Sequence, residues 1–221
     1  MPRVVDHQAR RRRIADALMR VAAARGLEAV SLRHVAAEAG VSTGMVQHYF
    51  RTKDEMMTFA IEMVGHDVQA RLSQDAGALG ESPAPRAVIR ALAVQILPLD
   101  DVRRREAQVG LAFMAYTAVR PEVGAGLRTN IAQMRGFLAG LIADGTTRPD
   151  IRDDPERAAA LLLALVDGLG LHVVNDTYSP EDALSALDAH LDSIFGTTSG
   201  PQHGNEPRRA AGPSGEHPTG S

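Results

Sequence analysis

The N-terminal part of the chain alternates apolar stripes with small polar residues that begin and end helices. Apolar side chains recur with helical spacing over residues 7–25 and predict a first helix. Ser31 is a suitable N-cap for a short second helix, LRHVAAEA, and Gly40 is a natural left-handed end for it. Ser42 or Thr43 then caps a third helix, GMVQHYF. Two short helices joined by Gly-Val-Ser predict a helix-turn-helix.

Beyond the third helix the hydrophobic pattern stays helical, and no alternating strand pattern appears. The segment Thr52-Lys53-Asp54-Glu55 begins a fourth helix, with acids in its first turn where the helix dipole favours them. After a connection at 78–85, further helices are predicted over residues 84–97, 100–119, 121–144, 154–175 and 180–195. The predicted fold is all-α with about nine helices.

The pattern divides the chain into three parts. Residues 1–57 are predicted to form an N-terminal domain of the DNA-binding type, which we call the head, with the helix-turn-helix at about 31–50. Residues 58–195 are predicted to form a C-terminal helical domain, which we call the body. Residues 196–221 contain six Gly and four Pro and almost no apolar side chains, so this tail is expected to be disordered.

Composition supports a soluble helical protein. Hydrophobic residues make up 44% of the chain and aromatic residues only 4%, so the core is expected to consist mainly of Ala, Leu and Val. Cysteine is absent, which excludes disulfides and thiolate zinc sites. No signal peptide is visible, and the longest apolar run, at 161–174, is too short for a membrane span and is broken by Asp167. A cytoplasmic location is therefore expected.

The small net charge of −3 conceals an uneven distribution. Residues 1–53 hold ten Lys or Arg and four Asp or Glu, a net charge of +6, which leaves −9 for the remainder. A basic head on an acidic body is typical of a protein in which one part meets a polyanion.

The helix-turn-helix supplies candidate contacts to double-stranded DNA. A recognition helix presents its first residues to base edges in the major groove, while hydroxyls and helix N-termini bind phosphates. Gly44 permits close backbone approach, and Phe50 is expected to be a core residue between the two helices. The predicted DNA-binding residues are Ser31, Arg33, Ser42, Thr43, Gly44, Gln47, His48, Tyr49 and Lys53.

Each candidate has a plainer interpretation. A Ser or Thr at a helix start is first a cap, and Tyr49 can pack rather than donate to phosphate. The RRRR run at 10–13 is either a solvated tract or a backbone contact. His34 with Glu38, and Glu62 with His66, have the spacing of paired metal ligands but are interpreted as surface pairs, so no metal is predicted.

The phrases SLRHVAAEAGVS and VSTGMVQHYFRTKDEM resemble the tetracycline-repressor (TetR) family, most closely its betaine-regulatory (BetI) branch. The motif covers residues 10–57; AFMAYTAVRP and ALLLALVDGLGLH are similar to that branch's C-terminal domain. The resemblance implies a homodimeric repressor that leaves a palindromic operator when its C-terminal pocket binds a small molecule. Relatives often carry Tyr three residues after the recognition-helix Gly. Here that position is Gln47, which hydrogen-bonds a phosphate or reads adenine.

An effector cavity is expected between the 100–119 and 121–144 helices, with core filling as the alternative. Its predicted lining is Phe113, Met114, Tyr116, Met134, Phe137 and Leu138, with His172 as a further candidate. The chain has no Trp and only three Tyr, so an aromatic cage for a quaternary ammonium ion is not supported. The expected effector is largely apolar.

Leucines on the last two helices predict a homodimer interface, with an intramolecular core as the alternative. The residues are Leu161, Leu165, Leu169, Leu184, Leu187, Leu191 and Ile194. A dimer would place two recognition helices in successive major grooves, roughly 34 Å apart.

No nucleophile elbow, phosphate loop or dinucleotide fingerprint is present, so neither an enzyme activity nor a cofactor is predicted. The leading hypothesis is a ligand-released transcriptional repressor. The alternatives are a non-specific DNA-associated protein and a helical enzyme that processes a small molecule.

Overall fold

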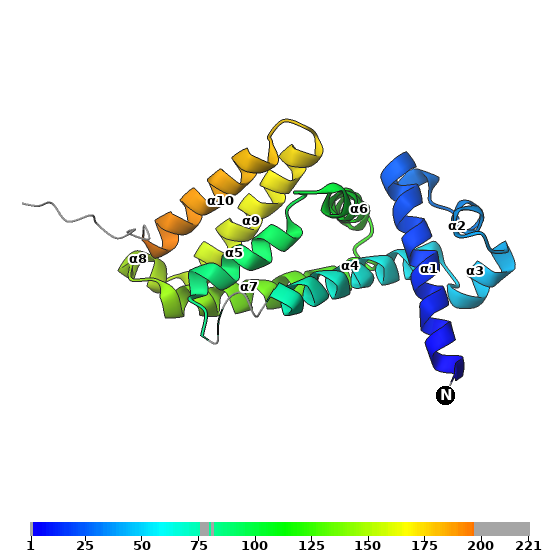
Figure 1. Ribbon diagram of the computed structural model, residues 1–221, viewed down its shortest axis with the longest axis horizontal. Coiled ribbons are helices and arrows are strands. Elements are labelled where there is room, and N and C mark those ends of the chain that lie inside the picture. Colours follow the sequence, from blue (N-terminus) through cyan, green and yellow to red (C-terminus); the bar gives the residue numbers. More distant parts are fainter. Residues whose placement is uncertain (1, 76–79, 81, 197–221) are drawn as a thin grey trace, which may run out of the picture.

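Three N-terminal helices and one 3₁₀ turn form the head of the molecule. They are α1 (Pro2–Arg25), η1 (Leu27–Ala29), α2 (Leu32–Ala39) and α3 (Thr43–Tyr49). The computed structural model describes residues 2–75, 80 and 82–196. The connection predicted at 78–85 therefore lies partly outside the described residues, and so does all of the tail predicted at 196–221 except Gly196. The head occupies one end of an elongated molecule (Figure 1).

Short-range hydrogen bonds set the ends of α2 and α3. Ser31 Oγ accepts from His34 N at 3.2 Å and caps α2, and Gly40 ends that helix in the left-handed conformation, with φ 65°. Of the two caps considered for α3, the structure selects Ser42, whose Oγ accepts from Met45 N at 3.1 Å. Thr43 is consequently the first residue of the helix rather than its cap.

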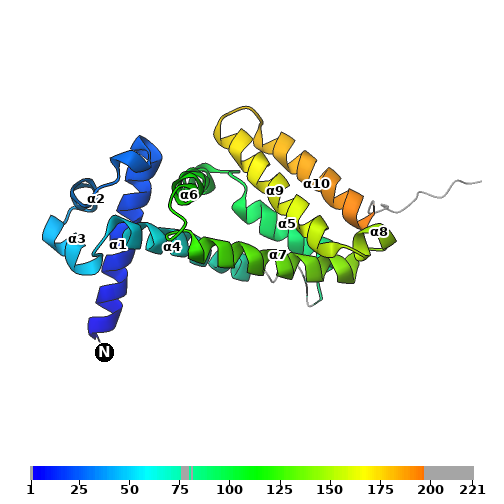
Figure 2. The same cartoon turned by 180° about the vertical axis from the view of Figure 1, so that it is seen from behind.

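A long helix, α4 (Lys53–Asp75), leads from the head into a bundle that forms the body. The body contains α5 (Pro85–Ile96), α6 (Asp101–Ala118), α7 (Ala125–Gly145), α8 (Pro149–Arg152), α9 (Pro155–Val174) and α10 (Pro180–Phe195). The domain boundary predicted at residue 57 falls inside α4. Figure 2 shows the same arrangement from behind, with α4 and α7 along the length of the molecule and α9 and α10 at the end away from the head.

The all-α prediction is confirmed, since the described residues form ten α-helices and no strand. Three features differ from expectation. α1 begins at Pro2, five residues earlier than predicted. α7 begins four residues later than predicted because residues 121–124 form a turn, and Pro149 begins an additional short helix, α8. Asp100, Asp154 and Ser179 cap α6, α9 and α10, and Ser179 with Asp182 forms a capping box.

The buried apolar side chains form two separate cores. The head core joins buried side chains of α1, α2 and α3 to the start of α4, and it also includes Val109 and Phe113 of α6. The body core is made by α5, α7, α9 and α10. Helix α6 therefore belongs to the body in sequence but packs on the head, and it lies between the two in Figure 1.

The length of α9 corrects one sequence expectation. This helix has 20 residues and a mean hydropathy of 1.7, so by length and composition alone it could cross a membrane. Six of its side chains, including Leu162, Val166 and Val173, are buried in the body core, and the helix packs against α7 and α10. It is therefore a core helix of the bundle with one apolar face left uncovered.

Candidate nucleic-acid interface

The recognition helix α3 separates buried from exposed residues along its length. Val46 and the capping residue Phe50 are both fully buried. The predicted groove-facing side chains, Thr43, Gln47 and His48, are exposed, as are Gly44 and Ser42. This arrangement presents short polar groups and one amide outward at the free end of the molecule, which is the geometry that base reading requires.

Helix α2 adds a second part to this surface. Arg33 is exposed, and no protein hydrogen bond or ion pair engages it in the described part of the chain. Ser31, in contrast, is only partly exposed and its hydroxyl is used as the α2 cap. Tyr49 is also partly buried, with its ring 4.7 Å from that of His7 and 5.2 Å from that of His48. Both interpretations of Tyr49, packing and phosphate contact, remain compatible with this position.

An arginine that lies over two adjacent phenylalanine rings supports the end of α3. The Arg11 guanidinium carbon lies 4.9 Å from the centre of the Phe50 ring and 4.3 Å from that of Phe59, and the two rings are 5.4 Å apart. A guanidinium stacked on aromatic faces stabilises the packing by about 0.5–2 kcal/mol per contact. The orientation of the recognition helix is therefore set from α1 and α4 together.

The basic run at 10–13 does not act as one phosphate-binding tract in this structure. Arg11 points inward against Phe50 and Phe59, and Arg12 makes an ion pair with Asp67 of α4. The helical twist turns consecutive residues about 100° apart, so Arg11 and Arg12 contact different neighbours although they are adjacent in sequence.

The position of Lys53 also differs from the sequence interpretation. Its Nζ donates to the Leu27 carbonyl oxygen at 2.7 Å and lies 5.7 Å from the centre of the Tyr116 ring. One of the three N–H donors of the ammonium is thus used inside the protein, where α4 begins beside the 3₁₀ turn. We therefore expect Lys53 to support the start of α4 rather than to contact phosphate.

The residue after Lys53 joins the head to α6 through a cluster that sequence analysis did not identify. The Tyr116 hydroxyl donates to Asp54 Oδ1 at 2.6 Å, and Arg120 donates to the Tyr116 hydroxyl and lies 3.6 Å from Asp54. Desolvation, followed by the bond to Asp54, raises the pKa of the Tyr116 phenol. We call Asp54, Tyr116 and Arg120 the junction cluster. Asp54 and Tyr116 are 62 residues apart in the sequence, so no local sequence pattern could have predicted this cluster.

The prediction of a cavity between α6 and α7 is wrong, because its expected lining residues belong to two separate cores. Phe113 is 3% exposed within the head core, and Tyr116 packs against that same core. Leu138 is instead buried in the body core and Met134 packs against it, whereas Phe137 is 51% exposed. Met114 is partly buried. The two sets face different cores because the turn before α7 directs it along the body while α6 crosses towards the head.

His172 lies beside a cavity at the other end of α9. Its ring stacks on Tyr178 at 4.6 Å, and its Nδ1 is 3.2 Å from Thr177 Oγ1. Thr177 and Tyr178 line an open cavity of about 490 Å³ between the α5–α6 and α9–α10 turns. Arg104 crosses this cavity, bonded to the Val173 carbonyl oxygen at 2.9 Å and paired with Asp176.

The predicted dimer residues separate into two groups. Leu169, Leu187, Leu191 and Ile194 are at most 4% exposed inside the body core, so they are corrected from interface to intramolecular packing. Leu161 is 56% exposed, and Leu165 and Leu184 are partly exposed. Leu161 shares the outer face of α9 with the exposed residues Ala160, Ala164 and Leu171. Three of the seven therefore remain available to a partner.

A capped two-helix unit with an exposed recognition helix, joined by one long helix to a separate helical bundle, defines a helix-turn-helix DNA-binding regulator. The model for bacterial regulatory proteins of the tetR family matches residues 14–58, and that for the C-terminal part of the BetI-type transcriptional repressor matches residues 85–196. The chain belongs to the TetR family. It is a DNA-binding transcriptional repressor and not an enzyme, which confirms the resemblance found in the sequence.

Relatives along most of the chain support this assignment. The transcriptional regulator PksA of Bacillus subtilis is 34% identical over 177 residues, covering 80% of this chain and 84% of PksA. The regulator BetI of Burkholderia mallei is 28% identical over 197 residues, covering 88% of this chain and 98% of BetI.

Solved structures agree with the fold. A transcriptional regulator from Rhodococcus sp. Rha1 has a TM-score of 0.73 and 40% identity, covering 83% of this chain and 95% of its own. A regulator from Saccharomonospora viridis in complex with choline has a TM-score of 0.66 and 23% identity, covering 83% of this chain and 94% of its own.

Proposed function

We propose that this protein is a cytoplasmic homodimeric repressor that binds a palindromic operator and leaves it when a small, largely apolar effector binds. The observation that carries the proposal is the exposed end of α3, where Thr43, Gln47 and His48 have free polar groups while Val46 and Phe50 anchor the helix. Seven residues of recognition helix reach only a few base pairs, so a second copy is needed for a longer site.

The uncovered face of α9 supports the homodimer. Leu161 and Leu171 are 56% and 46% exposed on this face, and the exposed side chains between them are those of Ala164 and Asp167. Small side chains let two helices approach closely, and a two-fold pair would bring the same face of each copy together. Helix α9 lies far from the head in Figure 1, so pairing there leaves both recognition helices free.

Release by an effector requires a structural connection between body and head. Helix α6 supplies it, because Val109 and Phe113 pack in the head core and Tyr116 bonds to Asp54 at the start of α4. An effector that binds more tightly to a different α6 position would favour a head arrangement that no longer fits the operator.

The test is binding to DNA from the region upstream of the protein's own coding sequence, measured across salt concentrations and by footprinting. We expect protection of one palindrome with half-sites about 34 Å apart and an affinity at least a thousandfold above that for random DNA. Equal affinity for random DNA would instead support the non-specific DNA-associated alternative. Protection without two-fold symmetry would contradict the homodimer.

A further inference from the structure

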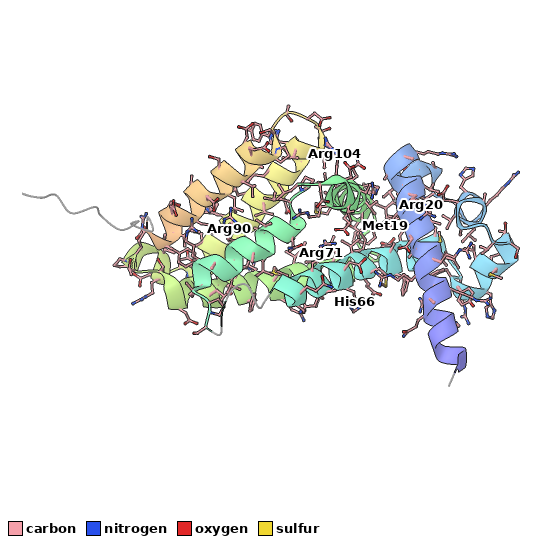
Figure 3. The ribbon with its side chains drawn as sticks, in the orientation of Figure 1. Met19, Arg20, His66, Arg71, Arg90 and Arg104 are labelled. Atoms are coloured by element: carbon pink, nitrogen blue, oxygen red, sulfur yellow. The ribbon has the colours of Figure 1, made fainter. Side chains whose placement is uncertain are left out.

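A second cavity lies where the head meets the body, between α1, α4 and α6. Its volume is about 400 Å³, within the size range of small-molecule sites. Met19 of α1, Met63 and Val64 of α4, and Val102 of α6 give it apolar walls. Figure 3 shows Met19 on the side of α1 that faces α6. We call this cavity the junction cleft.

Most of the charged side chains that line the junction cleft are already paired. These pairs are Asp67 with Arg12, Glu106 with Arg71 at 2.7 Å, and Arg20 with Glu38 at 2.7 Å. Arg71, which Figure 3 shows on α4, also donates to the side chain of Gln95 of α5 at 2.9 Å. These ion pairs join α1, α2, α4 and α6 around the cleft without filling it.

Asp16 is the carboxylate of the cleft that lacks such a partner within the described chain. It lies one helical turn from both Arg12 and Arg20, but these two arginines turn to other carboxylates. Desolvation in the cleft outweighs the attraction of the two arginines and raises the pKa of the Asp16 carboxyl. The Asp16 side chain is exposed, so the charged group of a ligand in the cleft can reach its carboxylate.

The sign of the remaining charges favours a cation over an anion. An anionic ligand in the cleft would meet the free carboxylate of Asp16 and pass close to those of Asp67 and Glu106. Arg105, on the α6 side, is the other charged lining residue without a partner in the described chain, and it is exposed like Asp16; the three carboxylates of the lining outnumber its two guanidinium groups, Arg20 and Arg105. Met side chains adapt to varied apolar shapes, so the walls suit a hydrocarbon or aromatic body.

We propose that the junction cleft binds a small organic cation, a protonated amine with an apolar body, whose ammonium group pairs with Asp16 and whose body lies between Met19, Met63 and Val102. This inference names a site and a ligand class for the effector, and so rests on the proposed function for its regulatory meaning. A ligand here touches α1 of the head and α6 of the body at once. A ligand that binds one position of the head more tightly than another would therefore shift the position of the recognition helix.

The experiment measures binding of three matched probes to the full-length protein by calorimetry at about pH 7.5. The probes are 4-phenylbutylamine, which is protonated at this pH, the neutral 4-phenylbutan-1-ol, and the anionic 4-phenylbutanoate. We expect the amine to bind and the alcohol and the acid to bind at least tenfold more weakly. A charge-assisted contact of this kind typically changes affinity by about ten- to a hundredfold.

Two variants test the site itself. Asp16→Asn keeps the shape of the side chain and is expected to weaken amine binding about tenfold, while the matched control Glu62→Gln, an exposed α4 acid outside the cleft, leaves it unchanged. Val102→Lys places a positive charge at a wall residue that is 51% exposed, and it is also expected to weaken binding of the amine. Circular dichroism confirms that each variant is folded.

The outcomes separate this inference from the proposed function. Equal amine affinity in wild type, Asp16→Asn and Val102→Lys, or an alcohol that binds as tightly as the amine, would overturn the cleft as a cation site. Tighter binding of the anionic probe would overturn it in favour of Arg105. Asp16-dependent amine binding with unchanged operator affinity would support the site and contradict effector release.

Discussion

The junction cluster offers the sharpest test of how the head is held, through the substitution Tyr116→Phe. The variant keeps the ring, and with it the contact to the Arg120 guanidinium carbon 4.3 Å from the ring centre. It loses the 2.6 Å bond to Asp54 and the bond that Arg120 donates to the hydroxyl. A hydrogen bond to a charged group typically stabilises a protein by about 1.5–3 kcal/mol. The Asp54 and Arg120 side chains are 42% and 48% exposed, and solvent screening reduces the expected loss to about 1 kcal/mol.

Urea unfolding at neutral pH measures this loss, and a double-mutant cycle with Asp54→Ala isolates the bond. Asp54 also lies in the first turn of α4, where it favours the helix dipole, so its single substitution costs more than the bond alone. The cycle removes that second contribution. We expect a coupling free energy of about 1 kcal/mol between Tyr116 and Asp54.

The raised pKa of Tyr116 gives the same test a pH dependence. In the unfolded chain the phenol ionises near its ordinary value of about 10, whereas the folded protein keeps it protonated to higher pH. Its contribution to stability is therefore complete below about pH 10 and is lost as the pH rises through the raised folded value. The difference in unfolding free energy between wild type and Tyr116→Phe should shrink over that range. A coupling below about 0.3 kcal/mol, or a difference that does not change with alkaline pH, would refute the role given to the hydroxyl.

Three further substitutions test the interface and the dimer. Gln47→Ala should cost about 1–3 kcal/mol of discrimination at one base-pair position in an operator library, and a uniform loss across all sequences would show that Gln47 contacts phosphate instead. Lys53→Met should lower the free energy of unfolding by about 1 kcal/mol, because the Leu27 carbonyl loses its donor, and should leave the salt dependence of DNA binding unchanged. A salt slope lower by about one unit would show instead that Lys53 contacts a DNA phosphate. Leu161→Glu should convert the dimer to a folded monomer in sedimentation experiments, and an unchanged dimer mass would remove the α9 face from the interface.

Much of the head follows from its sequence. Ser31, Gly40 and Ser42 set the ends of α2 and α3 through bonds that span three or four residues, so the sequence is sufficient to predict them. The exposed positions of Thr43 and Gln47 follow from the same local periodicity. The motif that identified the TetR family is made of these residues, and the family comparisons confirm it.

The packing of the body was predicted less well, because its helices carry apolar residues on more than one face. Spacing alone identified apolar residues on α6, α9 and α10 but not which core or surface each would join. Phe113 faces the head core, and Leu187 fills the body core rather than a dimer interface. The crossing of α6 over the head decided the first of these, and the packing of α10 on α9 decided the second.

The sequence by itself therefore determined the class of protein, the helix-turn-helix, the exposed polar positions of α3 and most helix boundaries, because capping and periodicity act within one or two turns. Only the tertiary structure decided that Lys53 turns to Leu27, that Tyr116 bonds to Asp54, and that a cleft with an unpaired Asp16 lies between α1, α4 and α6. These contacts join residues 26 or more positions apart. Their existence depends on the angles at which whole helices cross, which no short pattern specifies.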